Sequence, residues 1–114
     1  MSRTKREKKL SWKVLRYDWN KQKVVNSEIF SDDFIAILKR DRRRKKFTDY
    51  NSLKDYLKKD FQYHYWSKSE CEMMIGSLGE DDINKFEKID MYRQIEMNLD
   101  RITEYVIDVM QFRF

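Results

Sequence analysis

The densest group of chemically active side chains in the sequence is a run of cations at residues 39–46, which reads KRDRRRKK. Its basic members are Lys39, Arg40, Arg42, Arg43, Arg44, Lys45 and Lys46. Lysine and arginine at this density neutralise phosphate groups, so the run indicates binding to nucleic acid or to a nucleoprotein. It is also typical of a frayed, solvated helix end, where cations suit the negative end of the helix dipole. Like charges this close repel one another, so either interpretation requires an interaction that offsets the repulsion.

A second candidate for binding is the aromatic stretch at residues 61–66, which reads FQYHYW. Tyr63, Tyr65 and Trp66 could form a platform on which bases or a partner's side chains stack. The alternative is that these rings fill a corner of the core, where a helix gives way to a strand. We interpret the single histidine, His64, as structural rather than catalytic.

Patterns typical of enzymes are weak. The sequence contains no Walker loop, no Rossmann glycine pattern and no CxxC pair. Cys71 could approach His64, but it falls on the inward face of an expected strand, where a thiol is usually inert. Glu70, Glu72 and Asp90 form the best carboxylate set for a nuclease, and nothing orients them. We therefore expect a protein that is not an enzyme, with no cofactor and no metal ion.

Composition and charge limit the classes of protein to which the chain can belong. With 114 residues the chain fits one domain, and the net charge of +5 conceals a strong asymmetry. Residues 1–68 hold 20 Lys or Arg against 9 Asp or Glu, a net +11, whereas residues 69–114 hold 5 against 11, a net −6. Such a split favours electrostatic contact with a charged partner. One cysteine and the lack of a long apolar run or signal pattern predict a soluble cytoplasmic protein, with no membrane contact.

The elements that must position these side chains begin with a hairpin. Residues 1–9 form a basic tail, which we expect to be flexible or to contact nucleic acid, and residues 10–114 form a single domain. Residues 12–17 alternate and predict a strand, residues 18–21 a turn in which Asn20 takes a positive φ, and residues 23–30 a second strand. The strand pattern places Trp12, Val14 and Arg16 on one face and Lys13, Leu15 and Tyr17 on the other.

Two helices and a third strand should follow. Ser31 is the expected cap of the first helix, whose buried face carries Phe34, Ile37, Leu38 and Asp41. A second helix should begin at residue 51 or 52. The alternation at 70–78 predicts a half-buried strand with Cys71, Met73 and Ile75 on one face. Residues 79–88 are expected to form an acidic, polar loop.

The last element is the strongest prediction. Apolar residues at helical spacing mark one long helix over 90–112, capped by Asp90. The buried stripe comprises Tyr92, Ile95, Leu99, Ile102, Val106 and Val109. A neighbouring stripe that includes Met91, Tyr105 and Phe112 either packs in a monomer core or forms a seam with a second copy or a partner. The fold class is therefore α+β in the order β-β-α-α-β-α, a three-stranded antiparallel sheet packed by helices.

Two motifs carry a family resemblance. Residues 63–72, YHYWSKSECE, resemble a signature written YxYWS[KR]xExE, and residues 88–95, KIDMYRQI, resemble a signature K[IV]DxYxQ. Both occur in small uncharacterised proteins of phages, prophages and other mobile elements of Gram-positive bacteria. The resemblance covers about the C-terminal half and brings no catalytic residues with it. It implies an accessory protein in a bacterial host cell, and such loci often encode anti-CRISPR inhibitors.

Three hypotheses follow, in order. The first is a non-enzymatic, anti-CRISPR-like inhibitor that binds a host nuclease or its guide-RNA complex through charged surfaces. The second is a module that binds RNA or DNA directly through residues 39–46. The third is a small nuclease.

Overall fold

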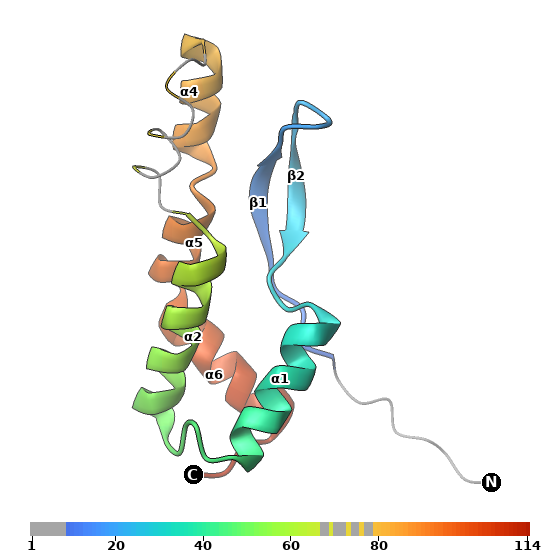
Figure 1. Ribbon diagram of the computed structural model, residues 1–114, viewed down its shortest axis with the longest axis vertical. Helices are drawn as coiled ribbons and strands as arrows, with labels where there is room; N and C mark the ends of the chain where they lie inside the picture. The colour runs from blue at the N-terminus through green and yellow to red at the C-terminus, as the bar shows by residue number, and fades with distance from the viewer. Residues whose placement is uncertain (1–8, 67–68, 70–72, 74–75, 77–78) are drawn as a thin grey trace, which may run out of the picture.

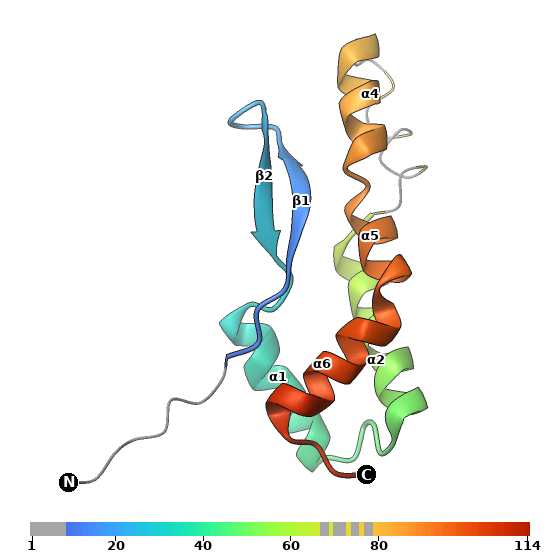
Figure 2. The same ribbon diagram turned by 180° about the vertical axis from the view of Figure 1, so that it is seen from behind.

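The computed structural model describes residues 9–66, 69, 73, 76 and 79–114, and within them the chain is a mixed α+β protein (Figure 1). Its elements are β1 (Lys13–Asp18), β2 (Lys23–Glu28), α1 (Asp32–Arg43), α2 (Tyr50–His64), α4 (Glu80–Lys88), α5 (Met91–Met97) and α6 (Leu99–Met110). The molecule is elongated, 56 × 36 × 20 Å, and the hairpin stands beside a column formed by α4 and α5 (Figures 1 and 2). None of the described helices has the length and apolar character needed to span a membrane.

The two strands pair antiparallel, with Lys13 opposite Glu28 and Asp18 opposite Lys23. The carboxylate of Asp18 shapes the turn, because it accepts hydrogen bonds from the backbone N–H groups of residues 20 and 21, at 3.0 and 3.1 Å. The positive φ of the turn falls at Gln22, with a value of 52°, and not at Asn20 as the sequence predicted.

The predicted alternation of the first strand is only partly present. Val14 and Tyr17 are buried, whereas Leu15 is 42% exposed and Arg16 is also exposed. Val14 belongs to the main core, and Tyr17 packs at the hairpin tip against Trp19. A two-stranded ribbon twists strongly, so residues of one strand meet different neighbours along its length.

The outer edge of β1 is bound by a side chain rather than by a strand. The amide of Gln94, on α5, accepts a hydrogen bond from the backbone N–H of Leu15 at 3.2 Å. The same amide donates to the carbonyl oxygen of Leu15 at 3.3 Å. Gln94 thus reproduces the donor and acceptor pair that a neighbouring strand would supply.

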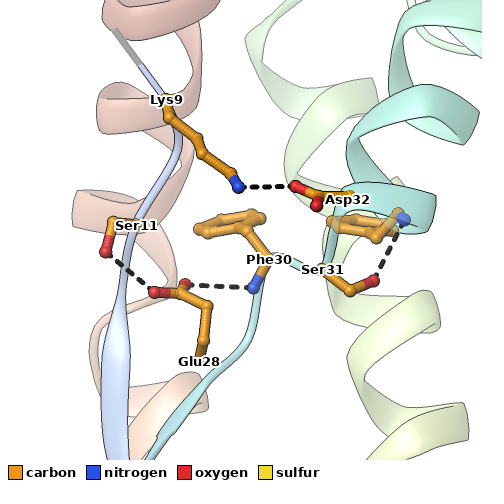
Figure 3. Close-up of polar contacts among 7 residues, drawn as sticks. Lys9, Ser11, Glu28, Phe30, Ser31 and Asp32 are labelled. Atoms are coloured by element: carbon orange, nitrogen blue, oxygen red, sulfur yellow. Dashed lines mark hydrogen bonds and ion pairs between the residues drawn. The ribbon is translucent and has the colours of Figure 1, made fainter.

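Glu28 joins the open end of the hairpin to the start of α1. Its carboxylate accepts hydrogen bonds from the backbone N–H of Phe30 (3.1 Å) and from the hydroxyl of Ser11 (2.8 Å) (Figure 3). It also accepts one from the backbone N–H of Trp12 at 2.6 Å. Burial, the largest single influence, raises the pKa of Glu28, but these three hydrogen bonds and the nearby Lys13 together hold the pKa below its usual value.

The first helix begins as the sequence predicted. The hydroxyl of Ser31 accepts a hydrogen bond from the backbone N–H of Phe34 at 3.1 Å, and Asp32 pairs with Lys9 at 2.6 Å (Figure 3). Phe34, Leu38 and Asp41 are buried on one face of α1, whereas Ile37, assigned to the same face, is 40% exposed. The second helix starts at Tyr50, one or two residues earlier than expected, because Asp49 and Ser52 form a capping box.

The core lies where α1, α2 and α6 meet beneath the hairpin. Its fully buried members include Leu38, Leu53, Leu57, Phe61, Ile102 and Val106. Each such side chain contributes about 1.5–3 kcal/mol through removal from water. The predicted stripe of the C-terminal segment is confirmed for Ile95, Leu99, Ile102 and Val106, all of which are buried.

Three predictions about the C-terminal half need correction or lie outside the described residues. The single helix over 90–112 is two helices, α5 and α6, because Asn98 interrupts it and its side chain donates to the carbonyl of Gln94 at 2.8 Å. The loop predicted at 79–88 is the helix α4. Of the third strand at 70–78, including Cys71 and Ile75, the structure describes only Met73 and Gly76. Neither lies in a strand, and Met73 is 84% exposed instead of inward.

Replacing Glu28 with glutamine should lower stability by about 1 kcal/mol at pH 7, because hydrogen bonds to a charged acceptor are stronger than those to a neutral one. A carboxyl whose pKa is lowered by folding stabilises the protein above its unfolded pKa, about 4.3, and this contribution disappears as the pH falls through the folded value. The stability difference between wild type and E28Q should therefore narrow as the pH falls below about 4.3 and close once the pH is below the folded pKa of Glu28, as measured by chemical denaturation. The control E96Q, at an exposed position of α5, should differ from wild type by less than about 0.5 kcal/mol. A gap for E28Q that does not depend on pH would contradict this role.

Candidate nucleic-acid interface

The cationic run, hereafter the basic turn (residues 39–46), forms the last turn of α1 and the bend that follows it. The buried face of α1 directs Asp41 inward, so the basic side chains on either side of it point away from the core. Six of the seven are exposed, and Arg42 is half-buried. The helix dipole supports this placement, since cations in the last helical turn contribute about 0.3–1 kcal/mol each.

The helix end is closed by backbone hydrogen bonds and is not the frayed end that the sequence also allowed. The N–H of Lys46 donates to the carbonyl of Asp41 at 2.9 Å, and the N–H of Lys45 donates to the carbonyl of Arg42 at 3.2 Å. This pair of bonds is a Schellman motif, which requires a left-handed residue that is usually glycine. Here Lys45 takes that conformation, with φ 56°.

Asp41, the only acid in the basic turn, anchors it to α2. Its carboxylate accepts a hydrogen bond from the hydroxyl of Tyr56 at 2.5 Å and another from Nε of Arg40 at 3.2 Å. These contacts, the Tyr56 hydroxyl first, lower the pKa of Asp41, while burial raises the pKa of Tyr56. At neutral pH, Asp41 is therefore ionised and accepts the hydrogen bond, while Tyr56 is neutral and donates it.

Arg42 binds the C-terminal residues. Its guanidinium lies 5.7 Å from the ring centre of Phe112 and 5.2 Å from that of Phe114, and it donates to the carbonyl of Arg113 at 2.8 Å. Cation–π contacts of this kind contribute about 0.5–1 kcal/mol at exposed sites. Arg42 is therefore engaged in contacts within the protein, and so is Arg40 through its hydrogen bond to Asp41.

Phe47 supports the basic turn from below. Its buried ring lies 5.0 Å from the ring of Tyr56 and 5.5 Å from that of Phe112. The end of α6 repeats the geometry of the end of α1, with Gln111 at φ 56° and the N–H of Phe112 donating to the carbonyl of Ile107 at 3.0 Å. Two helix ends of the same type therefore bring their following aromatic rings into contact.

The remaining cations of the basic turn are free to bind a ligand. They are Lys39, Arg43, Arg44, Lys45 and Lys46, all exposed. None of them forms an ion pair with a carboxylate in the part of the chain that the structure describes. The sequence could not separate these five from Arg40 and Arg42, because the partners of those two arginines are set by tertiary contacts.

A second feature, hereafter the aromatic pocket, lies between the hairpin tip, the end of α2 and the junction of α4 with α5. It has a volume of about 300 Å³ and is lined by Arg16, Tyr17, Trp19, His64, Tyr65, Trp66, Phe86, Ile89 and Met91. Two of the three predicted platform residues, Tyr65 and Trp66, line it. The third, Tyr63, is not among the lining residues and is 81% exposed.

Trp19 and Phe86 are pocket residues that the sequence did not single out. Their rings stack at 5.6 Å with an interplanar angle of 23°, and Tyr17 meets Trp19 edge-on at 4.6 Å. The sequence did contain a signal for α4. Acidic residues at 80–82 stand at the start of the helix and Lys85 and Lys88 near its end, which is the order that the helix dipole favours. With that helix recognised, Ile83 and Phe86 would have marked one face.

The three residues of the predicted partner seam all contact the protein's own interior. Tyr105 packs against Trp12 at 5.6 Å and accepts a hydrogen bond from the N–H of Ser11 at 2.9 Å. Phe112 contacts Phe47, and Met91 lines the aromatic pocket. Contact with a second copy or a partner through these residues stays a prediction.

The candidate catalytic residues do not converge within the described structure. His64 lies with Nε2 3.7 Å from the carboxylate of Asp60. Asp90 is buried and caps α5, accepting from the N–H of Arg93 at 3.1 Å. Glu70, Cys71 and Glu72 lie outside the described residues. Over residues 9–66 and 79–114, no three His, Cys, Asp or Glu side chains gather in a way that could hold a metal ion.

Comparison of the chain with protein-family models, with curated proteins and with solved structures finds no match. The basic turn and the aromatic pocket are therefore the two features of the structure from which a function can be inferred. Of these, the basic turn has the more specific chemistry, since its five exposed cations have no ion-pair partner in the described part of the chain.

Replacing Lys45 with glycine should raise the free energy of unfolding by about 0.5–1 kcal/mol, because glycine adopts a positive φ without a steric penalty. The change should appear as an increase of a few degrees in the thermal midpoint. Lys46→Gly removes the same charge at a residue without positive φ and should lower stability by a similar amount. Shifts of the same sign in both variants would contradict the geometry of the turn.

Proposed function

We propose that the protein binds nucleic acid, with the phosphate backbone held by the basic turn. The observation that carries this proposal is the set of five exposed cations without an ion-pair partner in the described structure. The backbone beneath them is fixed by the Schellman bonds and by the contact of Asp41 with Tyr56. Fixed cations bind at a lower entropic cost than cations on a flexible tail.

Binding of phosphate would also reduce the repulsion between the neighbouring cations of the basic turn. Five neighbouring positive charges destabilise the free protein, and a polyanion removes that repulsion while its own counterions are released. Each phosphate neutralised on duplex DNA contributes about 0.9 to the slope of log K against log salt concentration. The basic turn by itself can contribute a few such contacts, which corresponds to binding that is strongly salt-dependent and independent of base sequence.

An anti-CRISPR-like inhibitor is the second candidate, and it rests on the resemblance of residues 63–72 and 88–95. In that case the basic turn would contact the guide RNA or an acidic face within a host nuclease complex. Exposed acids on the opposite half of the chain, such as Glu104 and Asp108 on α6, would supply the complementary charge.

Changing Arg43, Arg44 and Lys46 together to alanine should weaken binding to RNA and DNA and reduce the salt slope by about 2 to 3. Fluorescence anisotropy at several salt concentrations measures both quantities. The matched control changes Lys21, Lys58 and Lys59, three exposed lysines on the hairpin turn and α2, and so removes the same charge. The control should retain most of the affinity. An equal loss in both variants would show that only net charge matters and would overturn the assignment.

A pull-down separates the two candidate functions. Tagged wild-type protein and the basic-turn variant are incubated with host lysate, with and without nuclease. Captured material that disappears after nuclease treatment, and is missing with the variant, supports direct nucleic-acid binding. A nuclease effector that stays bound after that treatment favours the inhibitor.

A further inference from the structure

The aromatic pocket has a composition that selects its ligand. Its walls come from the hairpin (Arg16, Tyr17 and Trp19) and from α2 and the residues after it (His64 to Trp66). The region from α4 to α5 completes it. Its volume of about 300 Å³ lies at the small end of ligand sites, large enough for one planar ring system and its substituent.

The rings of the pocket are partly open to solvent, as a stacking surface requires. Trp19 is 41% exposed and Trp66 is 50% exposed. Trp19 already stacks on Phe86, which holds its indole plane in place. Trp66 forms no ring contact with any other residue of the described ranges.

Charge decides between the ligands that bind aromatic rings. A quaternary ammonium or methylated lysine is attracted to a cage of rings, but such a cation would meet the guanidinium of Arg16 here. No aspartate or glutamate is among the lining residues. Arg16 itself is 45% exposed at its side chain and lies 3.8 Å from Asp18, a long contact that leaves most of its donors free. The pocket therefore favours a planar ring that carries a negative group.

We propose that the aromatic pocket binds one unpaired nucleobase, stacked against Trp66, with the neighbouring phosphate on Arg16. The inference rests on the proposed function and makes it specific, because a base inside a duplex cannot enter the pocket. The basic turn would then bind the backbone of any nucleic acid, while the pocket would confer preference for single strands. Stacking on an aromatic side chain contributes about 1–3 kcal/mol per base and tolerates any sequence.

The test compares Trp66→Ala with Tyr63→Ala, which removes an exposed ring from the same helix end but not from the pocket. Labelled oligo(dT) and a duplex of equal length are titrated by anisotropy, and circular dichroism checks that each variant is folded. Trp66→Ala should weaken binding of the single strand by about 5- to 100-fold and leave duplex binding within twofold. Arg16→Ala should also weaken single-strand binding, and Tyr63→Ala should match wild type.

A second arm uses free AMP, with tryptophan fluorescence as the signal, in wild type, Trp66→Ala and the basic-turn variant. Saturable quenching that survives in the basic-turn variant and is lost in Trp66→Ala supports the pocket. Equal single-strand affinity of Trp66→Ala and Tyr63→Ala, together with no saturable quenching by AMP, overturns the pocket while the basic turn still stands. If wild type binds neither oligo(dT) nor the duplex, the proposed nucleic-acid binding is wrong. AMP binding that depends on Trp66 would in that case still support a pocket for a free nucleotide.

Discussion

The contact of Phe47 with Tyr56 and Phe112 is the interaction on which the lower half of the molecule depends. It joins the end of α1, the middle of α2 and the segment after α6, which are far apart in the sequence. A left-handed residue at each helix end, Lys45 and Gln111, costs about 1–2 kcal/mol. Burial of a large apolar side chain contributes about 1.5–3 kcal/mol, and each aromatic pair adds about 0.5–1.5 kcal/mol. The packing of these rings therefore offsets the strain that positions the basic turn.

The two proposed binding surfaces would act through different forces, charge in the basic turn and stacking in the aromatic pocket. In the basic turn, Arg40 and Arg42 serve the fold through Asp41 and the C-terminal rings, and the other cations face solvent. Attraction to phosphate over such a surface falls within a Debye length, about 8–10 Å in physiological salt. Stacking in the aromatic pocket acts only at contact and is much less sensitive to salt. A ligand that bound both surfaces would first be attracted by the charge of the basic turn and then be held by stacking on the rings of the aromatic pocket.

Much of the fold was predictable because its signals are local. The Ser31 cap, the inward face of Phe34 and Leu38, and the apolar stripe from Ile95 to Val106 each follow from spacing along one helix. The break at Asn98 was missed, because an uninterrupted apolar stripe outweighed a single residue of low helix propensity. Helix α4 was missed because its acids were interpreted as loop residues.

The candidate site was predictable in its chemistry but not in its geometry. The basic residues are evident from composition, whereas their division into structural and free cations depends on Tyr56 and Phe112, which lie outside the run. The pocket combines Trp19 with Phe86, and no periodicity connects residues on a hairpin tip and a distant helix. Tertiary contacts of this kind have no signature in a single sequence.

The side-chain amide of Gln94 has a consequence for how copies of the protein meet in a crowded cell. A sheet of two strands has two open edges, and an open edge is a template on which other chains polymerise. By occupying both backbone groups of Leu15, Gln94 denies one edge to an incoming strand. On the other strand, the exposed charge of Lys23 opposes close stacking. A small hairpin can thus remain unpaired at its outer sides without seeding aggregation.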